Sequence, residues 1–258
     1  MAQAAAVHHG EHETSFWPLP TGLAVLFIPI ALTAYFAWHM PLLGLVLGGV
    51  AAALLAVGIG GWAREFFTKG AEEGLGPIAV GAFIASEVVI FGTMFAAFWM
   101  GRIVYAGQLS AWIPSNLNLT LALWLTIILW ASSATIVLAE RAMGRNDRNA
   151  SLGWIGATFV LGLLFVILHM NEWAHLAAGG FKLGANIYST TFYALTGVHT
   201  SHVVVGLLIQ IVLFVVIAAR LMTPERVTFF RASSLYWHFV DIMWLMVASN
   251  AYLVGGLR

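Results

Sequence analysis

The sequence has 258 residues, of which 61% are hydrophobic and only 9% are charged, and its mean hydropathy is +0.91. Soluble domains carry roughly 25% charged residues, so this chain has too little charge to cover a water-facing surface and is predicted to lie in a membrane. Its 11 basic and 11 acidic residues cancel, which argues against nucleic acid as a partner, and the absence of cysteine excludes disulfides, thiolate catalysis and metal sites with sulfur ligands.

Seven apolar runs are long enough to cross a bilayer as helices, which takes about 20 residues each. They cover residues 21–38, 41–62, 78–100, 117–139, 151–173, 189–219 and 232–254. Alternating segments of about ten residues, the pattern of a membrane β-barrel, do not occur. The sequence therefore predicts an all-α polytopic membrane protein with seven transmembrane helices.

The predicted organisation is a tail over 1–20, two transmembrane helices in 21–62, a charged loop over 63–77 and five transmembrane helices in 78–258. The first two helices are joined by a short turn at 38–41 and form an antiparallel hairpin. Gly44 and Gly48 have the GxxxG spacing that lets helices approach closely, although glycine is also simply common in membrane helices. The tail has no Lys or Arg and no early apolar core, so it is not predicted to be a signal peptide.

Basic residues in the loops predict the orientation, because Lys and Arg gather on the cytoplasmic side. Eight of the 11 fall on the side of the N-terminus and three on the other, which predicts a cytoplasmic N-terminus and a C-terminus outside. The eight are Arg64, Lys69, Arg141, Arg145, Arg148, Arg220, Arg226 and Arg231, and the three are Arg102, Lys182 and Arg258.

Glu87 lies about nine residues into the third predicted helix, which is about 14 Å along its axis and near mid-bilayer. An ionisable residue at this depth raises the free energy of membrane insertion by about 2.5–3.5 kcal/mol, so we expect it to have a structural or functional role. A carboxyl there can relay protons, bind a cation or make a structural hydrogen bond to a neighbouring helix. The sequence alone leaves these alternatives open.

Three further polar groups lie in or at the ends of predicted helices. His199 and His202 share a helix face, and interhelical hydrogen bonding is favoured over metal ligation because no further ligand set accompanies them. His238 and Asp241 are also three residues apart and are predicted to satisfy each other, with a proton relay as the second interpretation. Glu172 ends the fifth predicted helix near the outer interface, where it either bridges to another helix or is hydrated. No metal site or catalytic centre is predicted.

Three segments carry a resemblance to a known family. They are Ser86-Glu87-Val88 with the following FGTMFAAFW, the run FYALTGVHTSHV at 192–203, and YWHFVDIMWL at 236–245. In these segments, and over about residues 15–257, the chain resembles subunit III of haem–copper terminal oxidases of the cytochrome c oxidase type.

The resemblance implies a core subunit of a respiratory complex that reduces O2 to water and pumps protons across the membrane, expected here to be a bacterial inner membrane. In that family subunit III holds no haem or copper, packs against catalytic subunit I beside subunit II, and supports proton uptake. Its helices form two bundles, the first two against the other five, with structural phospholipids in the cleft between them.

The resemblance also suggests residue roles. Glu87 corresponds to a buried carboxyl beside the lipid cleft. His199, His202 and Glu172 correspond to polar links between the fifth and sixth helices, and His238 and Asp241 to a signature of the seventh helix. Trp62 and Arg64 weakly match a stretch after the second helix whose basic residue meets a lipid phosphate, so they are lipid-headgroup candidates.

The main alternative from another class is a secondary transporter that uses Glu87 and Asp241 as coupling carboxyls. Transporters usually carry internal repeats, and none is visible between the halves of this chain, which counts against that interpretation. Within the family, a quinol oxidase subunit and a nitric-oxide-reductase accessory protein are the alternatives.

Overall fold

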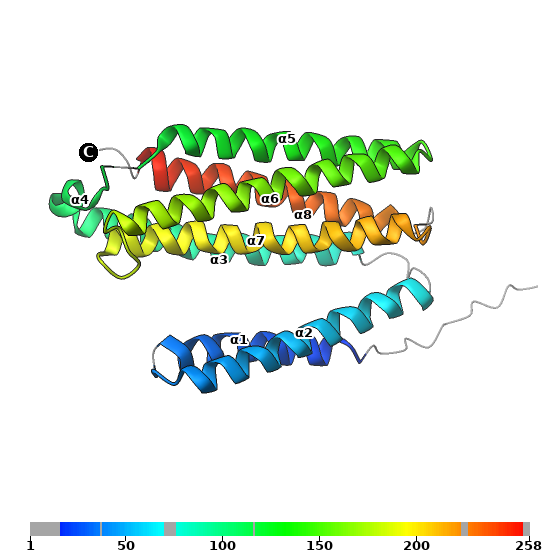
Figure 1. Ribbon diagram of the computed structural model, residues 1–258, viewed down its shortest axis with the longest axis horizontal. Coiled ribbons are helices and arrows are strands. Elements are labelled where there is room, and N and C mark those ends of the chain that lie inside the picture. Colours follow the sequence, from blue (N-terminus) through cyan, green and yellow to red (C-terminus); the bar gives the residue numbers. More distant parts are fainter. Residues whose placement is uncertain (1–15, 37, 70–75, 116, 223–226, 255–258) are drawn as a thin grey trace, which may run out of the picture. The chain divides into compact units, whose positions relative to one another are not determined.

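The structure is a computed structural model that describes residues 16–36, 38–69, 76–115, 117–222 and 227–254. All regular structure within these residues is helical (Figure 1). The elements are α1 (Pro18–Phe36), α2 (Pro41–Lys69), α3 (Gly76–Val104), α4 (Ala106–Trp112), α5 (Leu119–Gly144), α6 (Arg148–Ala178), α7 (Ile187–Ala218), α8 (Val227–Ala248) and the π-helix η2 (Ser249–Val254).

Six helices in the described part of the chain are long and apolar enough to cross a membrane, namely α1, α2, α3, α5, α6 and α7. The chain is therefore an integral membrane protein, as predicted. α8 occupies most of the seventh predicted segment but is not among the six. Its sequence contains Ser233, Ser234, His238 and Asp241, which lower its mean hydropathy.

The predicted loop over 63–77 is partly helical. α2 continues to Lys69, seven residues beyond the predicted end of the second span. The physical reason is local, because the segment after Trp62 contains no glycine or proline before Gly70 and nothing in it stops a helix. α4 is likewise a short helix in a stretch where the sequence predicted only a connection.

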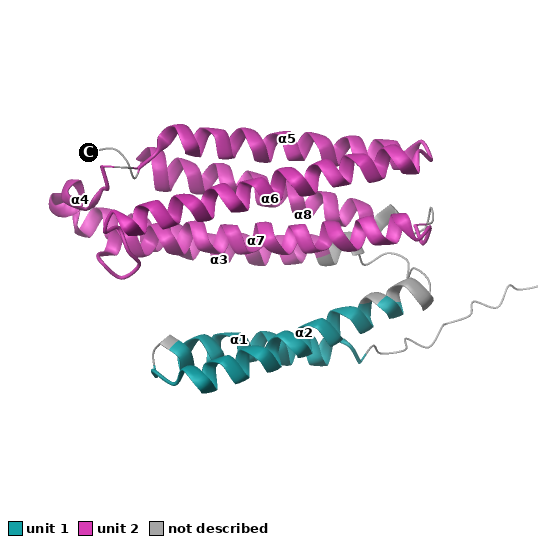
Figure 2. Cartoon of the chain, viewed as in Figure 1, with its two compact units in different colours: residues 1–72 teal, residues 73–258 magenta. Residues whose placement is uncertain are grey.

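The chain divides into two compact units, residues 1–72 and 73–258 (Figure 2). In the first unit, α1 and α2 pack along each other, and a connection at 37–40 joins them. A Cβ added to Gly44 would lie 2.7 Å from the Cβ of Tyr35 and 2.9 Å from the carbonyl oxygen of Ala31. Gly44 therefore permits a close backbone contact that alanine would obstruct, whereas at Gly48 the nearest such atom is 4.0 Å away.

In the second unit, five long helices lie side by side (Figure 1). α5 packs against α6 and α8, and α7 packs against α3, α6 and α8. Large aromatic side chains fill the space between them, and Phe165, Phe192, Trp237 and Trp244 are fully buried. Because lipid provides no hydrophobic force between helices, close packing and hydrogen bonds must hold this bundle together.

Side-chain caps position three of these helices. The side chains of Asn118 and Asp147 accept hydrogen bonds from backbone N–H groups in the first turns of α5 and α6. Asn186 and Ser189 form a reciprocal capping box at the start of α7. Such caps satisfy N–H groups that a helix cannot pair internally, which lets each helix begin at a defined residue.

The C-terminal π-helix η2 fixes the end of α8 to three other helices. Trp99 of α3 donates its indole N–H to Asn250 at 2.8 Å, and Tyr188 of α7 donates its hydroxyl to the carbonyl of Ala251 at 3.1 Å. Tyr252 donates its hydroxyl to Glu172 of α6 at 2.6 Å. π-helical turns are rare and often lie at functional positions.

Candidate functional site

Glu87 of α3 and His202 of α7 face each other inside the second unit. The Nε2 of His202 lies 2.8 Å from the Oε2 of Glu87, and Phe91 packs against the imidazole with 5.2 Å between ring centroids. The resemblance predicted that His202 would connect the fifth and sixth long helices, which are α6 and α7. That prediction is wrong, because the side chain of His202 contacts the carboxyl on α3 instead.

The hydrogen bonds of His202 determine how many protons this pair carries. Its Nδ1 lies 2.7 Å from the carbonyl oxygen of Val198, which can only accept, so Nδ1 carries a hydrogen. The 2.8 Å contact between Nε2 and Glu87 then requires one further proton, on either the imidazole or the carboxyl. Both arrangements are neutral overall. This neutrality avoids the cost that an unpaired charge would have within an apolar membrane-spanning helix.

A second buried cluster joins α6, α7 and η2 around Glu172. Glu172 is 4% exposed and accepts the hydroxyl of Tyr252, so it bridges to another element and is not hydrated at an interface. The Nδ1 of His169 is 3.4 Å from the same carboxyl oxygen, but not in hydrogen-bonding geometry. Of the two alternatives drawn from the sequence, Glu172 forms the bridge, but the hydroxyl that it accepts comes from η2 and not from α7, so the link between the fifth and sixth helices that the resemblance implied for Glu172 is wrong.

His199 is fully buried next to this cluster. Its ring packs against Trp244 and Phe165, at centroid distances of 5.0 and 5.7 Å, and His169 packs against the same two aromatic rings. Neither imidazole nitrogen of His199 has a hydrogen-bond partner among the described residues. His199 thus packs as an aromatic ring between helices, and the interhelical hydrogen bond predicted for it is not formed.

His238 and Asp241 do not bond to each other, contrary to the sequence-based prediction. Both reach Ser133 of α5, whose hydroxyl donates to Asp241 and lies 2.9 Å from the Nδ1 of His238. Because that hydroxyl has one hydrogen, it accepts from His238 while it donates to Asp241. Ser234 lies 3.4 Å from the Nε2 of His238 and extends the chain of hydrogen bonds.

Two tryptophans of α8 bond to the same helix. Trp237 donates its indole N–H to Ser132 at 2.9 Å, and Trp244 donates to Thr126 at 3.0 Å. Together with Ser133, these hydroxyls form a row of acceptors along α5 that fixes the register of α8.

Residues 9–256 match the sequence model of a family described as cytochrome c oxidase subunit III. The chain belongs to the cytochrome c oxidase subunit III family. The cytochrome c oxidase subunit 3 of Homo sapiens is 29% identical over 262 residues, which cover 96% of this chain and 98% of the relative. The resemblance drawn from the three sequence segments is thereby confirmed.

Other family relatives match a shorter stretch. The cytochrome bo(3) ubiquinol oxidase subunit 3 of Pseudomonas aeruginosa is 34% identical over 175 residues, or 68% of this chain and 83% of the relative. The cytochrome c oxidase subunit 3 of Corynebacterium diphtheriae is 30% identical over 174 residues, or 67% of this chain and 84% of the relative. Members of this family thus include subunits of both quinol and cytochrome c oxidases.

The lipid-headgroup candidates of this family member lie in the first unit. Trp62 is 49% exposed and Arg64 is exposed, and both belong to the continuous helix α2 and not to a loop. In the described part of the chain, no three His, Cys, Asp or Glu side chains lie close enough to hold a metal ion. Most of the tail over 1–20 and the segment 70–75 lie outside the described residues.

Sequence reasoning missed three residues that complete these polar groups. Ser133 and Tyr252 are the partners of Asp241 and Glu172, and Tyr236 donates its hydroxyl to the carbonyl of His202 at 3.1 Å. The available signal was the Ser132-Ser133 pair in the middle of a predicted span. Serine is a weak signal, however, because in membrane helices its hydroxyl often bonds the backbone of its own helix.

Proposed function

We propose that the chain is the non-catalytic subunit III of a proton-pumping haem–copper terminal oxidase, which reduces O2 to water in aerobic electron transport. The family match over residues 9–256 is the observation that carries this proposal. On this proposal the haem and copper centres belong to the partner subunits, and this chain binds none of them. Its principal partner is subunit I, and subunit II is the second.

The proposed task of the chain is to stabilise subunit I, support proton uptake there and bind structural phospholipid. The pairing of Glu87 with His202 supports a part in proton uptake, because these groups share one proton and the sequence predicts that Glu87 lies near mid-bilayer. When the pair passes this proton on, one negative charge remains on Glu87 and His202, so a second proton must arrive to restore neutrality, and this exchange is what proton uptake requires.

For the architecture we propose seven transmembrane helices in two bundles, with helices 1 and 2 separated from helices 3 to 7 by a lipid-filled cleft. α8 and η2 supply the seventh span, since their 22 and 6 residues extend about 40 Å at the rise of an α-helix. Trp62 and Arg64 are the proposed contacts to a lipid headgroup. The excess of basic residues on one side supports a cytoplasmic N-terminus and an external C-terminus.

The proposed location is the inner membrane of a bacterium, which bacterial relatives support. The electron donor, cytochrome c or quinol, is a property of another subunit. The length of a match does not distinguish the donors, because a cytochrome c oxidase relative and a ubiquinol oxidase relative both match about two thirds of this chain.

Purification of the complex through a tag on this chain tests the assignment. We expect haem-containing subunits to co-purify, and a preparation that contains this chain alone and conducts ions in liposomes would instead support the transporter.

The Glu87→Gln variant then tests the carboxyl. We expect an intact complex with slower proton uptake during turnover, whereas Ser86→Ala, on the exposed neighbouring residue, leaves both unchanged. Loss of assembly in Glu87→Gln would make the carboxyl structural, and an intact complex with unchanged proton uptake would contradict its part in proton delivery.

A further inference from the structure

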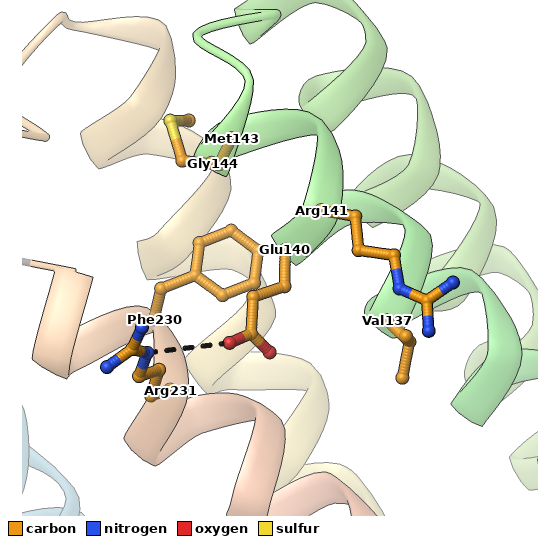
Figure 3. Close-up of a pocket in the computed structure, with 7 residues that line it drawn as sticks. All are labelled: Val137, Glu140, Arg141, Met143, Gly144, Phe230 and Arg231. Carbon is orange, nitrogen blue, oxygen red and sulfur yellow. Dashed lines mark ion pairs between the residues drawn. The ribbon is translucent and has the colours of Figure 1, made fainter.

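A cavity of about 320 Å³ lies between the C-terminal end of α5 and the N-terminal end of α8 (Figure 3). It is far along the chain from Trp62 and Arg64 and belongs entirely to the second unit. Its lining combines charged and apolar side chains: Val137, Glu140, Arg141, Met143, Gly144, Phe230 and Arg231.

The charged part of the cavity is cationic overall. Arg231 pairs with Glu140 across the two helices at 3.7 Å, and Arg141 extends on the other side of Glu140 (Figure 3). The side chain of Arg231 is 74% exposed, so this ion pair is weak and can exchange one partner for another anion. Two arginines and one glutamate leave a net charge of +1.

The C-terminal end of α5 disfavours the binding of an anion, because its unpaired backbone carbonyls carry about half a negative charge. Subtracting this from the +1 of the side chains still leaves the cavity positive. Arginine also suits a phosphate group in particular, since its planar guanidinium can donate two parallel hydrogen bonds to phosphate oxygens. The electrostatics therefore favour a phosphate or phosphodiester, with moderate affinity.

The cavity has an apolar part beside its charged one. Val137 is about one helical turn before Glu140 and Arg141, further from the end of the span, and Phe230 is fully buried. Glu140 lies four residues before the end of α5, or about 6 Å along its axis. Charged groups near the end of a membrane helix with an apolar side chain, Val137, one turn deeper match a lipid, which is charged at the surface and apolar below.

We propose that this cavity binds a membrane phospholipid, with Arg141 and Arg231 on the phosphodiester and Val137 against the first carbons of an acyl chain. The site is separate from the headgroup contact proposed for Arg64 and does not depend on the oxidase function. Inorganic phosphate shares the headgroup chemistry but has no apolar part. The apolar lining thus favours the lipid.

The absence of cysteine in the chain makes a direct test practical. Leu138→Cys, on an exposed residue beside the cavity, carries a fluorophore, and Leu123→Cys, 59% exposed near the other end of α5, carries the same label as the matched control. The full-length protein is placed in phosphatidylcholine nanodiscs with increasing brominated phosphatidylglycerol, whose bromines quench nearby fluorophores. We expect stronger quenching at position 138 than at 123.

Substitution of the arginines separates a site from general lipid contact. Arg141→Gln and Arg231→Gln should each lower the relative association constant of the brominated lipid, measured at position 138, about five-fold. This is the change expected when one basic residue near an anionic membrane is lost. Neither substitution should alter quenching at position 123. Substitution of lysine at both positions retains the positive charge and should keep most of the lipid binding. These lysine variants also serve as folding controls, together with circular dichroism and gel filtration.

Three results would overturn the proposal. Equal quenching at positions 138 and 123 means that no lipid site exists, and unchanged quenching in both Arg→Gln variants means that the arginines do not hold the headgroup. Displacement of the brominated lipid by millimolar inorganic phosphate, at constant ionic strength, would assign the cavity to free phosphate.

Discussion

The substitution Gly206→Ala tests how tightly α8 is held between α6 and α7. A Cβ at Gly206 would lie 2.6 Å from two ring atoms of Trp237, well inside van der Waals contact. The indole has little room to move, because a Cβ at Gly162 of α6 would also lie only 2.8 Å from the same ring. Trp237 thus fits between two glycines, and alanine at either position requires the ring or a helix to shift.

The expected cost follows from that geometry. Overpacking of a well-packed core costs about 1–3 kcal/mol. A shift of the indole also breaks the 2.9 Å hydrogen bond from Trp237 to Ser132, which contributes about 1 kcal/mol. We therefore expect Gly206→Ala to lower the free energy of unfolding by about 2–4 kcal/mol. The measurement is equilibrium unfolding of the purified chain in mixed detergent micelles, followed by circular dichroism.

A control and a double variant make this prediction specific. Gly156→Ala on α6, where an added Cβ has no atom within 4 Å, should cause no loss of stability. Phenylalanine has a smaller ring than tryptophan, so Trp237→Phe should relieve the clash that Gly206→Ala creates. The double variant should therefore lose about 1–2 kcal/mol less stability than the sum of the losses in the two single variants. The reasoning is refuted if Gly206→Ala is as stable as Gly156→Ala, or if the two single effects simply add.

The remaining predictions concern the partners of the two buried carboxyls. Ser133→Ala removes the hydroxyl that donates to Asp241 and should cost about 1–3 kcal/mol in the same unfolding measurement, whereas Ser201→Ala, on an exposed residue of α7, should change stability by less than about 0.5 kcal/mol. Equal effects of the two serine variants would show that the Asp241 contact is not stabilising. Tyr252→Phe removes the donor to Glu172 and should increase amide hydrogen exchange in η2, and unchanged protection there would contradict an anchoring role for the Tyr252 hydroxyl.

The long helices could be predicted from the sequence because a membrane helix is a local property. Each apolar run of about 20 residues satisfies its own backbone hydrogen bonds, so its existence does not depend on its neighbours. The ends were less predictable, as the continuation of α2 to Lys69 shows. η2 was missed because the sequence does not show its tertiary contacts, which come from Trp99, Tyr188 and Glu172.

The polar contacts could be predicted only in part. Depth in a span identified Glu87 and Asp241 as residues that require a partner, and both are buried and bonded. The identity of the partner could not be read from spacing. His238 lies three residues before Asp241 on one face of α8, but that common face turns both side chains toward Ser133 on another helix. Spacing within a helix predicts a shared direction and not a mutual bond.

Among the described residues of the second unit, three carboxyls are buried, and each connects a different pair of elements. Glu87 joins α3 to α7, Asp241 joins α8 to α5, and Glu172 joins α6 to η2. Lipid tails are as apolar as leucine, so apolar side chains alone do not decide which helices become neighbours. A carboxyl strongly disfavours any arrangement that leaves it without a partner, and three of them in one bundle therefore select one set of neighbours. α1 contains no charged residue, and it packs closely on α2 where Gly44 faces Ala31 and Tyr35. In the described part of the second unit, buried carboxyls thus help to select which helices become neighbours.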